Sequence, residues 1–349
     1  MRVYITIDTE CREERLDKHG DLIPAAGYDT RVWGRFENSP NELGIPLIMN
    51  TLEANGFKGC FFVDPFGSHS FGRYGLQEVC GNILARGHDV QLHAHPRQRV
   101  ADWKSRGLEP APDRMHEYSQ DEQRDLLAEG IDLLTQASVP RGEIVAFRAG
   151  HFAANDATHA AMADVGLKIS SNYNPCYRSN NECQLSDPQS ASSLYQSESG
   201  TWELPISNIR NGKGYRHLQI TALSAAEITA YLDQAQRSGV SDAVIVTHSF
   251  EQFYLQQVTP PRGRINSINA ARLSAVCRFL AAEPERFQVA TMPELAHHIE
   301  HQKPQQGVEK GFAPALRKDL RLRRNFEQIV KKLDTFKPLP GFLMPRAGV

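Results

Sequence analysis

The chain has 349 residues, of which 40% are hydrophobic and 23% are charged, and its formal net charge is −2. This length accommodates one large hydrophobic core or two moderate ones. The near-neutral charge excludes a broad attraction to nucleic acid or to anionic membranes, and the lack of a run of about 20 apolar residues excludes a predicted transmembrane helix.

The amino-terminal segment and the cysteines indicate a compartment. The sequence starts directly with a predicted strand and lacks the apolar core of a signal peptide, so a cytoplasmic location is expected. None of the six cysteines forms a CxxC pair, and we expect reduced thiols that mostly fill the core. Cys176 and Cys183 are seven residues apart, and a disulfide or a soft metal pair is the alternative for them.

The first predicted strand covers residues 2–10 and is rich in β-branched and aromatic residues. It ends in two carboxylates, Asp8 and Glu10, at i, i+2 spacing. Acids at the end of an apolar strand need a positive partner, such as a metal ion or an arginine. The alternative is an ordinary strand end that faces solvent.

Predicted helices and strands then alternate along the chain. Helices are expected over 41–55, 74–86, 119–137, 155–166 and 266–282, with another that starts at 224; further strands are expected at 61–63 and 287–291. Ser119-x-x-Glu122 and Ser224-x-x-Glu227 are capping boxes that mark two of the helix starts. This alternation predicts parallel strands with outer helices, closed or nearly closed into a barrel.

The segment Asp89-Val-Gln-Leu-His-Ala-His95-Pro is the most informative one in the chain. In a continuous strand, His93 and His95 point to the same face because side chains two residues apart share it. The proline that follows ends the strand, so both imidazoles lie at its tip and form a platform for a divalent metal. The alternative is a surface histidine pair without a ligand.

Two later apolar runs end in the same way. Residues 144–151 end in Arg148 and His151, and residues 243–250 contain His248. Carboxyl ends of parallel strands meet at one rim of a β/α fold. The sequence therefore predicts a single site at that rim.

Taken together, these segments resemble those of polysaccharide deacetylases of the NodB-homology type (carbohydrate esterase family 4), and most closely the divergent branch found in lipopolysaccharide and O-antigen biosynthesis clusters. The resemblance covers roughly residues 1–300 and rests on the order of five short segments, which are Ile7–Glu10, Gly87–His93, Phe147–Gly150, Trp202–Ser207 and Val246–His248. It implies a distorted β/α barrel, irregular and (β/α)7-like, over residues 1–302.

The sequence departs from the family pattern at three places. Thr9 stands where the family has a second, adjacent aspartate, and Arg97 stands where it has a second metal histidine, so His95 would substitute for it. The arginine segment continues with Gly150-His151-Phe152 in place of a proline and an aromatic residue.

The resemblance implies a metal-dependent hydrolase that removes the acetyl group from an N-acetylated sugar in cell-surface polysaccharide biosynthesis. Asp8 would be the base, Arg148 would hold it ionised, and His248 would protonate the leaving amine. His93 and His95 would bind a divalent metal with Glu10, or alternatively Asp8, and such a set fits Zn²⁺ best. His151, Trp202 and Glu203 would contact a carbohydrate substrate.

Two other functions stay open from the sequence. One keeps the fold and hydrolyses another C–N bond, such as that of a small amide. The other is a degenerate barrel that binds a glycan or acts as a scaffold; the lost HxxxH spacing favours it, and the retained Asp8, Arg148 and His248 argue against it.

Three irregular stretches, 11–40, 96–118 and 172–200, are expected to be rim loops. They carry aromatic residues that would either stack on a sugar ring or pack on the barrel, namely Trp33, Phe36, Trp103 and Tyr173.

The carboxy-terminal residues 303–349 form a separate basic extension, with eleven Lys/Arg against four Asp/Glu. Within it, residues 317–333 have an amphipathic pattern. We expect a basic helix that lies across the acidic barrel; contact with an acidic partner, another subunit or a membrane surface is the alternative.

Overall fold

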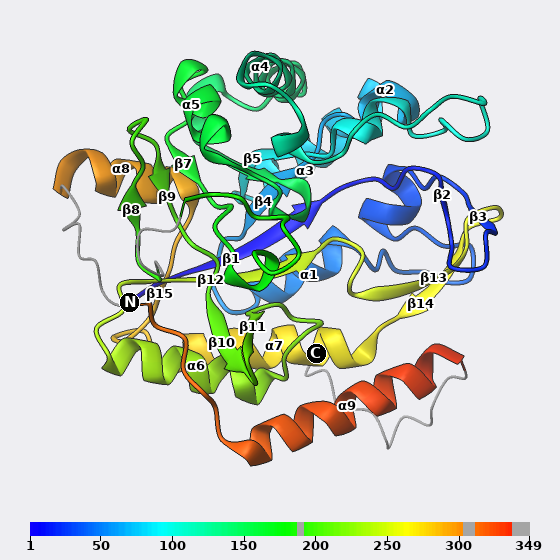
Figure 1. Ribbon diagram of the computed structural model, residues 1–349. Helices are drawn as coiled ribbons and strands as arrows, with labels where there is room; N and C mark the ends of the chain where they lie inside the picture. Colours follow the sequence, from blue (N-terminus) through cyan, green and yellow to red (C-terminus); the bar gives the residue numbers. More distant parts are fainter. Residues whose placement is uncertain (187–191, 303–310, 337–349) are drawn as a thin grey trace.

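A computed structural model describes residues 1–186, 192–302 and 311–336 (Figure 1). Its centre is a nine-stranded sheet in the order β12-β1-β4-β5-β6-β7-β9-β8, with β15 also paired to β1. Every pairing along this path is parallel except that of β8 with β9. The strands are β1 (Arg2–Thr9), β4 (Cys60–Val63), β5 (Asp89–Ala94), β6 (Ala146–Ala149), β7 (Ile169–Ser170), β8 (Tyr195–Gln196), β9 (Trp202–Glu203), β12 (Asp242–His248) and β15 (Gln288–Val289).

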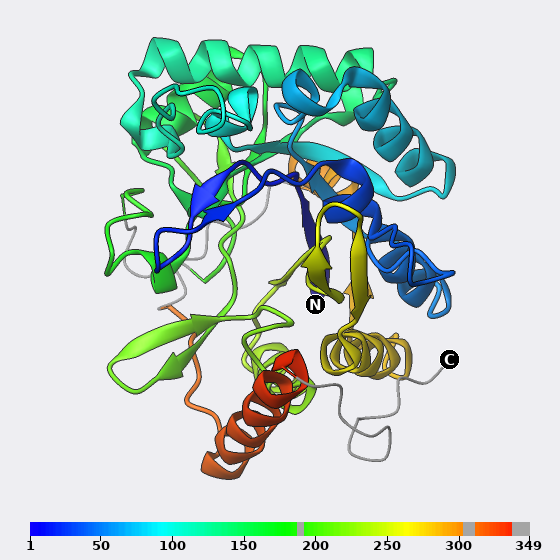
Figure 2. The ribbon, with the colours of Figure 1, turned by 90° about the vertical axis from the view of Figure 1, so that its right-hand side faces the viewer.

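Helices surround this curled sheet, as the two views show (Figures 1 and 2). They are α1 (Ile45–Glu53), α2 (Ser68–Phe71), α3 (Arg73–Ala85), α4 (Gln120–Gln136), α5 (Asp156–Asp164), α6 (Ala225–Arg237), α7 (Ser267–Ala281), α8 (Met292–Gln302) and α9 (Lys318–Phe336). The arrangement is a distorted β/α barrel, so the predicted fold class is confirmed. None of the helices in the three described ranges is long and apolar enough to cross a membrane.

The first strand shows how the sequence builds two apolar layers. Val3, Ile5 and Ile7 pack in the core between the sheet and the helices, whereas Tyr4 packs in a second cluster on the inner face of the sheet. Alternate side chains of a strand point to opposite faces, and both faces of β1 are covered. A strand that is covered on both faces has a mostly apolar sequence, and all residues of β1 after Arg2 are buried.

Strand register sets the level of the candidate site residues. β1 runs parallel to β12 with Asp8 opposite His248, and β5 runs parallel to β6 with His93 opposite Arg148. These four residues therefore lie at the same carboxyl-terminal rim of the sheet.

The predicted starts of four helices are confirmed, whereas the helix expected from residue 41 begins only at Ile45. Ser119 and Ser224 accept hydrogen bonds from the backbone N–H of Glu122 and Glu227, and these glutamates return the capping-box contact. Asn155 and Asn266 accept hydrogen bonds from the backbone N–H groups of Thr158 and Asn269 at the starts of α5 and α7. Such caps satisfy backbone N–H groups that the first helical turn leaves unpaired.

Three hairpins that the sequence did not predict project from the barrel. They are β2–β3 (Arg15–Leu16 and Leu22–Ile23), β10–β11 (Asn208–Asn211 and Gly214–His217) and β13–β14 (Phe253–Gln257 and Arg262–Ile265). The first and a short π-helix, η1 (Tyr28–Trp33), lie in a stretch predicted to be irregular. All six cysteines have free thiols, and five of them are buried.

The described part of the tail, residues 311–336, contains helix α9, which packs on the barrel. Its Arg324 forms an ion pair with Glu227 of α6 at 3.1 Å, and its Asp334 pairs with Arg264 of β14 at 2.9 Å. The residues between α8 and 311 lie outside the described ranges, so a domain boundary at residue 302 stays a prediction.

Candidate active site

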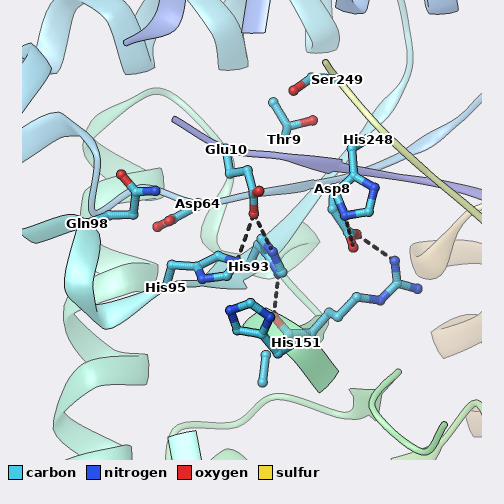
Figure 3. Close-up of polar contacts among 12 residues, drawn as sticks. Asp8, Thr9, Glu10, Asp64, His93, His95, Gln98, His151, His248 and Ser249 are labelled. Carbon is cyan, nitrogen blue, oxygen red and sulfur yellow. Dashed lines mark hydrogen bonds and ion pairs between the residues drawn. The ribbon is translucent and has the colours of Figure 1, made fainter. Parts of the chain in front are cut away.

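Three possible metal ligands meet at the rim, at the carboxyl-terminal ends of β1 and β5 (Figure 3). The Oε2 atom of Glu10 lies 2.8 Å from Nε2 of His95 and 3.3 Å from Nε2 of His93. Ligands held 2.0–2.1 Å from one tetrahedral zinc ion lie about 3.3 Å from one another. The two distances from Glu10 are close to this value, and the ligand atoms of all three residues lie within 4.8 Å of one another, so this Glu10–His93–His95 cluster could hold a small divalent cation.

The second nitrogen of each imidazole is fixed by another group. Nδ1 of His93 lies 2.7 Å from the carbonyl oxygen of Arg148, and only a protonated nitrogen can donate to a carbonyl. Nδ1 of His95 lies 2.9 Å from Oδ2 of Asp113. Both contacts leave Nε2 directed at Glu10, and such outer contacts commonly orient metal-binding histidines.

Asp8 and Arg148 form a buried ion pair beside this cluster. Nη1 of Arg148 donates to Oδ1 of Asp8 at 2.6 Å, and the same nitrogen donates to Oγ1 of Thr6 at 3.0 Å. The rest of the guanidinium is satisfied by the carbonyl and hydroxyl of Ser171, at 3.2 and 3.0 Å. Arg148 is fully buried, so its orientation is fixed by these contacts.

His248 lies on the other side of Asp8, at the end of the neighbouring strand. Its Nε2 is 3.8 Å from Oδ2 of Asp8, and its Nδ1 is 2.9 Å from Oε1 of Glu251. Glu251 also accepts a hydrogen bond from the Thr247 hydroxyl at 2.9 Å, and it is bonded to Gln219. Glu251 therefore holds the imidazole with Nε2 facing Asp8.

These contacts shift the proton affinities of the carboxylates. Burial alone favours the neutral acids, but Arg148, His93 and His248 outweigh it and hold the pKa of Asp8 below its ordinary value. His95 and His93 likewise hold the pKa of Glu10 well below its ordinary value. Both groups are therefore ionised at neutral pH.

The pKa values of His95 and His248 shift in the opposite direction. Burial disfavours an imidazolium, but Asp113 and Glu10 outweigh it and raise the pKa of His95 well above its ordinary value. Glu251 and Asp8 similarly overcome burial and raise the pKa of His248 to about 9. In protonated His95, Nδ1 faces Asp113 and the proton on Nε2 lies toward Glu10, where a metal cation would bind.

A small cavity of about 90 Å³ connects these groups. Its lining residues are Asp8, Glu10, His93, His95, Ala149, His151, Phe152, Tyr177, His217, Gln219 and His248. Six of the nine site residues expected from the sequence therefore line it, and Arg148 contacts it through Asp8.

Sequence reasoning missed several groups of this site. Asp113 lies in a stretch without periodicity, and nothing in the sequence linked it to His95. Glu251 follows His248 by three residues, and that spacing was a usable signal. Phe152 and Tyr177 are the aromatic residues at the cavity, with ring centroids 5.1 Å apart.

The structure does not bring Trp202 and Glu203 to this cavity. Glu203 is fully buried and accepts hydrogen bonds from the backbone N–H groups of Asn172 and Tyr173, both at 2.7 Å, and it contacts His159 at 3.0 Å. It ties β9 to the segment after β7. Trp202 packs against the inner apolar cluster.

The aromatic residues expected in the rim loops mostly pack on the barrel. Trp33, Phe36 and Tyr173 are buried, and Trp103 donates its indole N–H to the carbonyl of Glu14 at 2.8 Å. His151, in contrast, is half exposed at the mouth of the cavity, 3.3 Å from Asp113.

No protein-family model matches this chain, and no curated protein matches its sequence. Among solved structures, it is similar to a protein of Mycobacterium smegmatis described as a "putative polysaccharide deacetylase", with a TM-score of 0.52 and 17% identity over 90% of this chain and 93% of that one. It is also similar to a 4-alpha-glucanotransferase of Thermococcus litoralis, with a TM-score of 0.50 and 12% identity. That match covers 99% of this chain but only 48% of the glucanotransferase. Likeness at these identities establishes the fold.

Proposed function

We propose that the protein is a metal-dependent hydrolase that removes the acetyl group from an N-acetylated sugar. The observation that carries this proposal is that one cavity is lined both by candidate metal ligands and by a candidate acid–base pair. The Glu10–His93–His95 cluster is a set of metal ligands, and Asp8 and His248, 3.8 Å apart, are an acid–base pair beside it.

The donor set supports a divalent cation, with Zn²⁺ the best match. Two imidazole nitrogens and one carboxylate are a common catalytic zinc set, which leaves a fourth position for water or substrate. Two further buried carboxylates near this cluster, Asp8 and Asp113, are held ionised because cationic neighbours outweigh burial and lower their pKa values. When bound, the cation would polarise the acyl carbonyl and lower the pKa of water at the site.

The protein's own side chains would transfer the protons of the reaction. Asp8, held ionised by Arg148, would accept a proton from the attacking water. His248 is protonated at neutral pH and would donate its proton from Nε2 to the nitrogen of the leaving amine. The products are acetate and the free amino sugar, so the proton taken from water and the proton given to nitrogen balance.

The cavity size supports a small acyl group. About 90 Å³ is far below the roughly 300–1,000 Å³ of pockets that enclose whole drug-sized ligands. An acetamido group would enter, while the sugar ring stays at the mouth near His151. The same space also admits a small amide, which keeps hydrolysis of another C–N bond as the second candidate. The link to cell-surface polysaccharide synthesis rests on the family resemblance of the sequence.

The test combines metal analysis with acetate release. Purified protein is analysed for bound divalent ions and then incubated with N-acetylglucosamine oligomers and with acetanilide. We expect one Zn²⁺ per chain, and acetate release from the sugar that stops after chelation and returns with Zn²⁺. The matched control is His69→Ala, because His69 is an exposed histidine paired with Glu129 outside this cavity.

Three results would contradict parts of the proposal. Acetate from acetanilide alone would favour the small-amide reaction. A chain that binds the oligomers without hydrolysing them would favour a scaffold. A protein that takes up no divalent ion, with His93→Ala as active as the wild type, would refute the metal-dependent mechanism.

A further inference from the structure

Helix α9 presents a continuous apolar stripe to solvent. Four of the nine large hydrophobic side chains that are exposed in the described ranges lie on this one helix. They are Leu322, Phe326, Ile329 and Leu333, and their exposed fractions are 66%, 68%, 59% and 54%. Their spacing of four, three and four residues puts them on one side of the helix.

The opposite side of α9 is polar and is held against the barrel. Arg324 is buried in its ion pair with Glu227, and Glu327 pairs with Arg272 at 2.9 Å. Lys331 donates to Asn269 of α7 at 3.2 Å. Ordinary surface helices bury their apolar side and expose their polar side. This helix does the reverse, and its position outside α6 and α7 leaves the stripe uncovered by any described residue (Figures 1 and 2).

Cations flank the stripe. Lys318, Arg321 and Lys332 are exposed on α9, and no hydrogen bond or ion pair joins them to the described residues. The β10–β11 hairpin contacts the segment before α9 through Arg210 and adds the exposed Lys213. An apolar stripe with cationic margins is typical of helices that lie in the interface of an anionic membrane.

We propose that α9 docks the protein on an anionic lipid bilayer, with the stripe in the acyl boundary and Lys318, Arg321 and Lys332 at the lipid headgroups. A nucleic acid would match the charges but would leave the four apolar side chains in water. A second copy of the chain that met this one stripe to stripe would bring the unpaired cations of both helices together. The bilayer satisfies both features at once.

The test measures sedimentation of the full chain with lipid vesicles. Vesicles contain phosphatidylcholine alone or an equal mixture of phosphatidylcholine and phosphatidylglycerol. We expect co-sedimentation with the anionic mixture, little with the neutral vesicles, and release at high salt because screening weakens the headgroup contacts. The apolar-face variant Leu322→Ser/Phe326→Ser should lose binding. Its control, Leu16→Ser/Leu22→Ser, removes exposed side chains of the β2–β3 hairpin and should bind normally.

A second pair of variants tests the charges. Changing Lys318, Arg321 and Lys332 to glutamine should lower the partition coefficient about fivefold per residue, or about 100-fold together. Glutamine at the exposed Lys58, Lys104 and Arg106 removes the same charge elsewhere and should leave partitioning nearly unchanged.

The proposal is overturned if the wild-type chain stays in the supernatant with anionic vesicles, or if the apolar-face variant binds them as well as the wild type does. Circular dichroism confirms that the variants are folded. A stable dimer in analytical ultracentrifugation that Phe326→Ser dissociates would show that a second copy occupies the stripe, and would equally overturn it.

Discussion

Nδ1 of His248 lies 2.9 Å from the Glu251 carboxylate, and this contact sets the charge of the imidazole. Although burial disfavours the imidazolium, Glu251 and Asp8 raise the pKa of His248 to about 9. A general acid must be protonated to act, so the proposed activity should persist up to that pH and fall above it. The contact also stabilises the folded state. This stabilisation is fully present below pH 6.5 and is lost as the pH rises through about 9.

Glu251→Gln tests this relationship. Without the carboxylate, the pKa of His248 should fall toward its ordinary value of about 6.5. The alkaline limb of the profile of kcat/KM against pH should therefore move to lower pH. Glu109→Gln, at an exposed loop position, is the control and should leave the limb in place. An unchanged limb in Glu251→Gln would show that His248 is not the group that titrates.

His95→Ala should weaken metal binding, because it removes one of the three candidate ligand atoms of the Glu10–His93–His95 cluster. A ligand at 100 times its Kd stabilises a protein by about 2.7 kcal/mol, so Zn²⁺ should raise the melting temperature of the wild-type chain. We expect this shift to vanish in His95→Ala and to persist in His69→Ala. An equal shift in His95→Ala would place the metal elsewhere.

Asp113→Asn should lower metal affinity without removing a ligand. Asp113 holds Nδ1 of His95 at 2.9 Å, and loss of such outer contacts typically costs about 10–100-fold in affinity. Competition titration with a chromogenic chelator measures this change. Asp121→Asn, on the exposed side of α4, should titrate like the wild type. Wild-type affinity in Asp113→Asn would mean that packing alone orients His95.

Asp8→Asn and His248→Ala should each reduce turnover by roughly 10²–10⁴-fold, since general acids and bases contribute that much. His248→Ala should leave metal content intact. A His248→Ala variant that hydrolyses the substrate at the wild-type rate would remove this histidine from the mechanism.

Arg148→Met should destabilise the fold by roughly 3–5 kcal/mol, because it leaves Asp8 buried without its cation. Unfolding in urea measures this loss. Asp8→Asn/Arg148→Met should recover part of the stability and none of the activity. If the double variant is as unstable as the sum of the single variants, the two residues do not act as a pair.

The strand ends of the site could be predicted because each is a short apolar run that stops at an ionisable residue. Asp8, Glu10, His93, His95, Arg148 and His248 share that pattern, and parallel pairing brings them together. The supporting groups could not be predicted in this way. Asp113 reaches His95 from an irregular loop, and its placement depends on tertiary packing that leaves no periodic trace.

The short elements were equally hard to predict. β7 and β9 pair over two residues each, which is too short for an alternating pattern. Glu203 illustrates the consequence: it lies in a segment that resembles a family motif, yet it is bonded to backbone N–H groups inside the barrel.

The pairing of β1 with a distant strand affects how the chain folds during its synthesis. Arg2 pairs with Asp242, 240 residues later, so the first strand made must wait for nearly the last one. Until β12 emerges from the ribosome, one edge of β1 stays open, and Asp8 has no His248 beside it. An open apolar edge is prone to pair with other chains, and contacts so distant in sequence form slowly. Chains that terminate before residue 242 should therefore accumulate as inactive aggregates.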